Sequence, residues 1–233
     1  MRIIEIVVLF LLLAALAISP LAISAPTGAS VTQVGTQERY QPSAGSVTTQ
    51  GGNVTALNVS GEVVTSKWAG FWGNVSGSKV LADSGHHLFY KWTVSDLTDA
   101  LVYATTGAVN DWSCSNIVPL YADDSLFGSY SFLIEGADSF NYTFTEQESV
   151  AIPKGCSEQS FNYTTTWQGG SQGTEFKTYA AKASAENVFV WVARVNPGKT
   201  SFKGGTVTAD YQLLAGVTSE TGTTTFYFYL ELP

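Results

Sequence analysis

Few residues of this sequence have the types and spacing that chemistry requires. His86 and His87 are its two histidines, and they are adjacent. Because neighbouring side chains of a strand point to opposite faces, at most one could join a Ser-His-Asp triad, and both on one metal ion would be awkward. The serine of segment 73–77, GNVSG, lies one position too late for a G-x-S-x-G nucleophile elbow. We interpret both histidines as surface strand residues.

Acidic residues outnumber basic ones by 19 to 11. Paired carboxylates could hydrolyse glycosides, but so many acidic residues offer pairs that their presence does not discriminate. Asp111, Asp123 and Asp124 could bind calcium through oxygen ligands; the EF-hand spacing is absent, and solvated acidic turns are the simpler interpretation. We therefore expect no catalytic site, no cofactor and no metal centre, and predict that the chain is not an enzyme.

Cys114 and Cys156 are the only cysteines. In an exported chain, an even number of cysteines predicts a disulfide, and the alternatives are a metal pair or a redox site. No CxxC spacing occurs, and neither histidine lies near a cysteine in the sequence. The pattern favours the disulfide.

Residues 1–24 predict a Sec-type export signal. Residues 6–18 form an unbroken apolar run behind a minimal positive start at Arg2, which suits a signal peptide better than a membrane span of about 20 residues. Cleavage after Ser24 would leave small residues at both recognition positions. One alternative is an uncleaved anchor. Another is a type IV pilin-like subunit, in which Glu5 would precede an assembly helix. We expect an extracellular protein of the cell surface, attached to the membrane only if this segment is retained.

The composition excludes some partners. The formal charge is −8, only 13% of residues are charged, and no Lys/Arg cluster occurs. Nucleic-acid binding and docking on anionic lipid both need a basic face, so neither is expected. Low charge with abundant Thr, Ser, Gly and Tyr is typical of extracellular β proteins.

Five N-x-[ST] triplets without proline predict glycosylated surface turns and strand ends. A chain rich in Asn, Ser and Thr also produces such triplets by chance, so the alternative is that most are unmodified. They begin at Asn53, Asn58, Asn74, Asn141 and Asn162.

Period-2 patterns predict strands through most of the chain. Residues 86–94 alternate, with Leu88, Tyr90, Trp92 and Val94 on one face. Residues 187–195, NVFVWVARV, are apolar on both faces, as in a covered central strand. Residues 223–232 place Phe226, Phe228, Leu230 and Leu232 opposite Tyr227, Tyr229 and Glu231. Residues 175–182 could form a strand or a helical turn, and residues 110–140 are the least regular and could include a short helix.

About ten short strands separated by turns predict an all-β fold, a single β-sandwich of the Ig-like or jelly-roll-like kind after an N-terminal hydrophobic leader helix. We expect the sandwich in residues 53–233, although Thr55, Leu57 and Val59 give only a hint of alternation at its start. Residues 25–52 are polar and predict an arm or spacer.

Trp68, Phe71 and Trp72 lie in a glycine-punctuated stretch, WAGFWG. Such aromatics could form a platform on which sugars stack, which makes them candidate ligand-binding residues. In an all-β fold, Trp and Phe more often fill the core. Both interpretations are open at this point.

Several motifs together resemble a group of archaeal exported proteins. They are GNVTALNVSG (52–61), WAGFWGNVSGSKVLAD (68–83), LFYKWTVSD (88–96), VYATTG (102–107) followed by WSC, and the closing TTTFYFYLEL. The resemblance implies an extracellular β-rich surface protein without established enzymatic activity, with its cysteine pair at Cys114 and Cys156. The insert PLYADDSLFGSYSFL (119–133) departs from the group.

These observations favour a non-catalytic structural or interaction protein of the cell surface. We expect its partners to be copies of itself or other surface proteins, joined into a filament or coat by β-strand addition through the polar arm. The alternative is a monomeric adhesive module that binds glycans or proteins.

Overall fold

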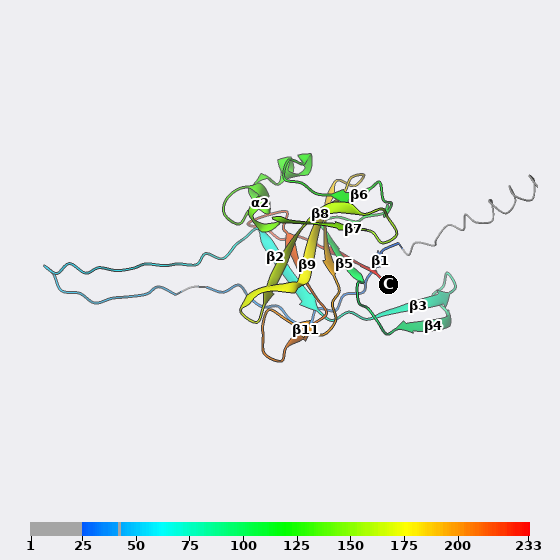
Figure 1. Ribbon diagram of the computed structural model, residues 1–233, viewed down its shortest axis with the longest axis horizontal. Coiled ribbons are helices and arrows are strands. Elements are labelled where there is room, and N and C mark those ends of the chain that lie inside the picture. Colours follow the sequence, from blue (N-terminus) through cyan, green and yellow to red (C-terminus); the bar gives the residue numbers. More distant parts are fainter. Residues whose placement is uncertain (1–24, 42) are drawn as a thin grey trace, which may run out of the picture.

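The computed structural model describes residues 25–41 and 43–233 (Figure 1). The predicted export signal, the uncleaved anchor and the pilin-like start all concern residues outside this part of the chain. They stay predictions.

The described residues form fourteen strands and three short helices, more strands than the ten expected, because several have only two or three residues. The strands are β1 (Thr27–Gly28), β2 (Trp68–Gly73), β3 (Gly77–Ala82), β4 (Leu88–Val94), β5 (Leu101–Thr105), β6 (Ile117–Pro119), β7 (Glu146–Val150), β8 (Gln159–Gln168), β9 (Ser171–Ala183), β10 (Val188–Arg194), β11 (Lys199–Thr200), β12 (Thr208–Ala209), β13 (Tyr211–Gly216) and β14 (Tyr227–Glu231). The helices are η1 (Ser125–Ser129), η2 (Ser131–Ile134) and α2 (Phe140–Thr143).

One antiparallel sheet of eight strands dominates the molecule. Its order is β1-β14-β5-β10-β9-β8-β7, and β6 pairs with the end of β9. Three two-stranded ladders, β2–β13, β3–β4 and β11–β12, complete the β structure. The prediction of an all-β protein is confirmed.

Strand β10 lies at the centre of this sheet and is covered on both faces. Trp191 and its alternate neighbours pack into one apolar cluster, while Val190 and Val192 pack into a second cluster on the opposite face. All three side chains are fully buried. This confirms the interpretation of NVFVWVARV as a central strand, since β-branched and aromatic residues fill both faces of the pleat.

A second layer covers the Trp191 face of the sheet. Leu213 and Ala215 of β13, together with Trp68 and Phe71 of β2, pack into the same cluster as Trp191. Residues of η1, η2 and α2 complete this layer, among them Leu126, Phe127, Leu133 and Phe140. The ladder and the helices on one side and the sheet on the other form the two layers of a sandwich.

The last strand follows the expected alternation. Phe228 and Leu230 pack into the Trp191 cluster, while Tyr229 packs into the opposite one. Residues 175–182 belong to strand β9, so the strand alternative was correct there. The irregular stretch 110–140 contains only β6 and 3-10 turns, with α2 beginning at its end.

Two segments differ from the expected organisation. Thr27–Gly28, expected in a free arm, pair with Leu230 and Tyr229 at the edge of the sheet. The weak alternation around Thr55–Val59 forms no strand. The other leg of the chain runs beside these residues (Figure 1), and the hydroxyls of Thr49 and Thr55 are 3.1 Å apart, but no strand ladder joins the two legs. The sandwich strands that follow the arm begin at Trp68.

Candidate interaction site

A long arm leaves the large sheet after β1 and returns to the compact part of the molecule at β2, in the β2–β13 ladder. We define the arm as residues 29–41 and 43–66, which contain no strand or helix. In Figure 1 it extends far to one side of the compact part as two legs, from blue to cyan. The legs meet at a turn in which the amide of Asn53 donates to the carbonyl of Gln50, at 3.2 Å.

The arm is fixed only at its base. Thr65 Oγ1 donates to Asp138 Oδ2 at 2.7 Å, and Lys67 Nζ, beside it, pairs with the same carboxylate at 2.8 Å. These hydrogen bonds lower the pKa of Asp138, with the lysine the larger cause. The described residues from 30 to 63 are all exposed. Packing against the chain's own domain therefore does not determine where the arm lies.

The β3–β4 hairpin projects from the opposite side of the compact part (Figure 1). Its strands pair from Gly77–Val94 to Ala82–Leu88, with an irregular register after Leu81. The turn is held by Asp83, whose carboxylate accepts bonds from the His87 amide and from His87 Nδ1, both at 2.8 Å. The side-chain bond from His87 is the main cause of a lowered Asp83 pKa. Both histidines are exposed, as expected, but they lie in the turn before β4 and not on the strand that the alternation of residues 86–94 predicted.

One face of the hairpin carries a group of exposed apolar side chains, which we call the hairpin face: Leu81, Tyr90 and Trp92. Leu81 lies opposite Tyr90 in the ladder, so their side chains project to the same side. The rings of Tyr90 and Trp92 are 4.7 Å apart. The three side chains are 52%, 56% and 50% exposed. Alternation did predict that Tyr90 and Trp92 share a face, but not that this face has no covering layer.

The root of the hairpin is anchored to the end of the chain. Lys79 Nζ donates to the carbonyl of Pro233 at 2.9 Å, and the Leu232 side chain lies so close to Gly77 that no Cβ would fit. Val94, the last residue of β4, pairs with Gly77 at the same root and packs against the main core. The hairpin is therefore joined firmly to the domain while its outer part meets only solvent.

Most of the exposed apolar surface lies in these two projections. Of the twenty large apolar side chains that the described residues expose, eight belong to the arm and six to the hairpin. Soluble monomers scatter such residues singly, and concentrated ones mark interaction sites. The arm contributes Val31, Val34, Tyr40, Val47, Val54, Leu57, Val59 and Val63, and the hairpin contributes Val80, Leu81, Leu88, Phe89, Tyr90 and Trp92.

The aromatic residues proposed from the sequence as ligand-binding lie elsewhere. Trp68 donates its indole N–H to the carbonyl of Asp138 at 2.7 Å and packs edge-on against the core residue Trp191. Phe71 packs against Phe228 of the last strand and Phe226 just before it. Trp72 contacts Phe202 instead, under the ammonium of Lys203. The structure does not bring the three together as one exposed platform.

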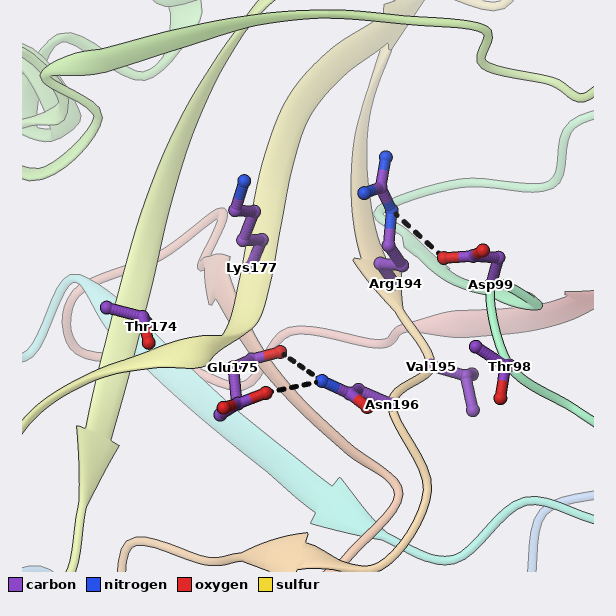
Figure 2. Close-up of a pocket in the computed structure, with 8 residues that line it drawn as sticks. All are labelled: Thr98, Asp99, Thr174, Glu175, Lys177, Arg194, Val195 and Asn196. Carbon is purple, nitrogen blue, oxygen red and sulfur yellow. Dashed lines mark hydrogen bonds and ion pairs between the residues drawn. The ribbon is translucent and has the colours of Figure 1, made fainter.

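A polar cleft of about 230 Å³ lies beside β9 and β10 (Figure 2). Its cations are already paired: Lys177 Nζ lies 2.8 Å from Glu148, and Arg194 lies between Glu148 and Asp99 at 3.7 and 3.8 Å. Burial favours the neutral form of Glu148, but the hydrogen bonds from Lys177 and Tyr179 outweigh it and lower the pKa. Since carboxylates balance both cations, the cleft offers little attraction for an anion.

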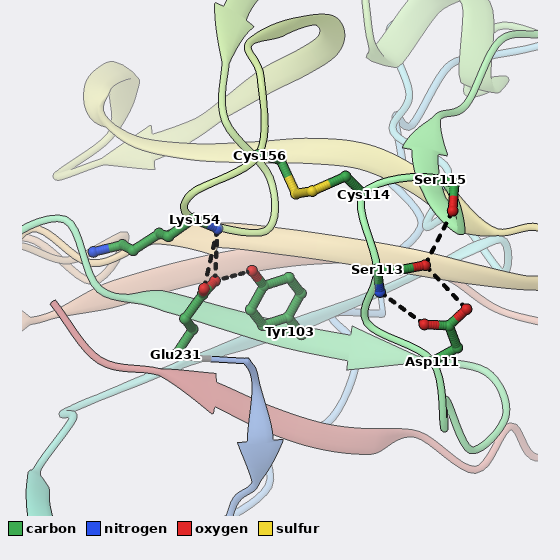
Figure 3. The surroundings of a disulfide bond; sticks show 8 residues. All are labelled: Tyr103, Asp111, Ser113, Cys114, Ser115, Lys154, Cys156 and Glu231. Atoms are coloured by element: carbon green, nitrogen blue, oxygen red, sulfur yellow. Dashed lines mark hydrogen bonds between the residues drawn. A yellow bond between two sulfur atoms is a disulfide. The ribbon is translucent and has the colours of Figure 1, made fainter. Parts of the chain in front are cut away.

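The two cysteines form a disulfide, as the sequence favoured (Figure 3). The bond joins Cys114, before β6, to Cys156, between β7 and β8, with 5.5 Å between the Cα atoms. It ties together two loops that cover the second apolar cluster, to which they contribute Trp112 and Ile152.

Next to this disulfide, Glu231 is fully buried (Figure 3). Its carboxyl accepts hydrogen bonds from the Tyr103 hydroxyl and, at 3.0 Å, from the main-chain amide of Lys154. Burial raises the pKa of Glu231 despite these bonds, and burial also raises the pKa of Tyr103. The sequence had placed Glu231 on a sheet face without indicating that the side chain is enclosed.

The raised pKa of Glu231 makes the stability pH-dependent. The folded chain holds this proton more tightly than the unfolded chain, so the stabilisation from protonation is complete below the ordinary glutamate pKa and is lost as the pH rises through the raised value. We expect Glu231→Gln to gain stability relative to the natural chain between pH 4 and pH 8, measured by urea unfolding. The exposed Glu62→Gln is the control, and a constant difference across this range would contradict the assignment.

Four of the five glycosylation triplets have exposed asparagines, at Asn53, Asn58, Asn74 and Asn141. Asn162 differs, since it is 8% exposed and its amide donates to the carbonyl of Leu120 while accepting from Gln147. A glycan there would have to be attached to an amide nitrogen that lies in a nearly buried position beside the Leu120 carbonyl. The first four stay predicted sites.

Two of the three aspartates considered for calcium, Asp111 and Asp124, make other bonds, and Asp123 is exposed. Asp111 accepts from Ser113, and Asp124 pairs with Lys182 and caps η1. Within residues 25–41 and 43–233, no three His, Cys, Asp or Glu side chains are grouped as metal ligands would be.

No family model, curated protein or solved structure matches this chain. In the part that the structure describes, no helix has the length and apolar character to cross a membrane. The fold and the two projections define the class: an all-β, disulfide-linked protein with an extended arm and an exposed aromatic hairpin.

Proposed function

We propose that the chain is a non-catalytic, extracellular subunit that assembles with copies of itself into a filament or coat on the cell surface. The observation that carries this proposal is the arm. Its described residues between 30 and 63 are exposed and lack regular structure, yet they include Val54, Leu57, Val59 and Val63, each more than half exposed. A segment of this kind can add as a strand to the sheet of a second molecule.

The length of the arm supports the same conclusion. Each leg has about 20 residues and spans up to about 60 Å when extended. A compact domain of the size formed by residues 67–233 has a diameter of about 40 Å. The arm therefore reaches well beyond its own domain, as a segment that contacts a neighbour must. Export, the disulfide, predicted glycans and the resemblance to archaeal surface proteins are consistent with this role.

The arm can be tested without disturbing the fold. We expect Leu57→Ser, Val59→Ser and Val63→Ser together to convert the assembled protein to monomers, as measured by light scattering and negative-stain electron microscopy. Strand addition uses alternate side chains for packing, and these three share one face of an extended leg. Because they are exposed, thermal unfolding should not change.

The matched control replaces exposed aromatics of the compact part, Tyr142→Ser with Trp167→Ser, and should assemble normally. If the arm variant assembled as the natural chain does, the proposal would be wrong.

Glycan binding by a monomeric module is the second candidate. The exposed, adjacent rings of Tyr90 and Trp92 favour it, since sugars stack on such surfaces. It predicts a monomer that binds a glycan array and loses that binding in Trp92→Ala.

A further inference from the structure

The β3–β4 hairpin is incomplete as an isolated structure. Two strands alone are marginally stable in water and normally need a third strand or a packed layer. Here Leu81, Tyr90 and Trp92 each remain half exposed or more, and none of them belongs to either apolar cluster of the described chain. Burying this face would stabilise the hairpin.

The returning leg of the arm also lacks a strand with which to pair. From residue 53 to residue 63 it has extended backbone without strand partners. Thr55, Leu57 and Val59 would share one face of a strand there, and Leu57 and Val59 are 58% and 90% exposed. Asn58 would point away from that face, so a glycan on it would not obstruct pairing.

The arm and the hairpin cannot meet within one molecule. They project from opposite ends of the compact part along the longest axis (Figure 1). Joining one copy's arm to the next copy's hairpin uses two different surfaces, so the contact is heterologous and propagates along the axis.

The charges are compatible with this contact. Residues 77–94 contain Lys79, Lys91 and one aspartate, so the hairpin carries a positive formal charge in a chain of −8. Residues 43–66 contain a single charged residue, Glu62. A negative leg that meets a positive hairpin avoids like-charge repulsion.

We propose that residues 53–63 of one copy add as a β-strand to an edge of the β3–β4 hairpin of the next copy, which places Leu57 and Val59 beside the exposed Tyr90 and Trp92. This inference rests on the proposed self-assembly and names the surface that receives the arm. Strand addition supplies backbone hydrogen bonds, and Leu57 and Val59 supply packing against Tyr90 and Trp92.

The contact can be detected by crosslinking two single-cysteine variants, each added to the natural disulfide. We expect Leu57→Cys mixed with Leu88→Cys to give covalent dimers with a short bismaleimide. Leu57→Cys mixed with Tyr142→Cys, exposed on the compact part, should give none. Equal yields from both mixtures, or dimers from neither, would overturn the inference.

Substitution of the hairpin gives a second test. We expect Leu81→Ser, Tyr90→Ser and Trp92→Ser together to raise the dissociation constant for assembly about a hundredfold or more, as for the loss of aromatic anchors. Val80→Ser, a partly exposed position opposite Lys91 in the ladder, is the matched control and should assemble normally.

The two proposals fail differently. If the hairpin variant assembled normally while the arm variant did not, the hairpin would not receive the arm, and the proposed self-assembly would stand. If both variants assembled normally, both proposals would be wrong. Thermal unfolding of the arm and hairpin variants identifies any loss of the fold itself. The crosslinking test uses neither of these variants, so it is independent of their folding.

Discussion

Trp191→Ala is expected to lower the free energy of unfolding by about 3–5 kcal/mol, the range for removing a large aromatic side chain from a close-packed core. Trp191 is fully buried, and its ring lies within 6 Å of the rings of Trp68, Phe144 and Phe189. These neighbours belong to β2, β10 and the segment after α2, so the cavity would loosen both layers of the sandwich.

Urea unfolding measures this effect, with Trp167→Ala as the control because that side chain is 60% exposed. The control should change the free energy of unfolding by no more than about 0.5 kcal/mol. Similar values for the two variants would contradict the assignment of Trp191 to the core.

Removal of the disulfide by Cys114→Ser with Cys156→Ser is expected to cost about 4 kcal/mol. The bond closes a loop with a sequence separation of 42 residues, and the chain-entropy model gives this magnitude for the loss of freedom in the unfolded chain. The loops it joins also hold Trp112 against Tyr103 and Tyr229, with ring distances of 4.9 and 4.8 Å.

The same urea experiment, with and without a reducing agent, measures this cost. The natural chain under reducing conditions should behave as the double variant does. A loss below about 1 kcal/mol would mean that the loops are held by their packing alone.

The local sequence pattern was sufficient to predict strands whose apolar faces are packed against the rest of the molecule. The residues of β10 are apolar on both faces because both faces are packed, and the alternation of β14 separates Phe228 and Leu230 from Tyr229. The disulfide was predicted from the even number of cysteines and the predicted export signal. The strand patterns depend on nearest neighbours in the sequence, and the disulfide depended on there being only two cysteines to pair, so the sequence is informative about both.

The candidate site depended on tertiary packing and could not be predicted in the same way. WAGFWG and LFYKWTV have similar aromatic content, yet Trp68 and Phe71 pack against the core while Tyr90 and Trp92 are exposed. Alternation in β4 indicates two faces but not whether a layer covers either of them. The covering of Trp68 and Phe71 in β2 depends on tertiary structure such as β13, which pairs with β2 although it lies more than 100 residues away in the sequence.

The arm shows the same limit. Its alternation at Thr55, Leu57 and Val59 has the form of a strand, but a strand exists only when a partner supplies the hydrogen bonds. The other leg of the arm runs beside these residues, with the Thr49 and Thr55 hydroxyls 3.1 Å apart, but no strand ladder forms between the legs in the described chain. The boundary expected at residue 52 therefore moved to the start of β2, and the residues in between became part of the projecting arm.

The central claim is self-assembly, and the most direct measurement is negative-stain electron microscopy, with light scattering, of the full chain released from its native surface. The account predicts regular filaments or lattices, with the long axis of each subunit following the repeat. A monodisperse monomer at high concentration would contradict it.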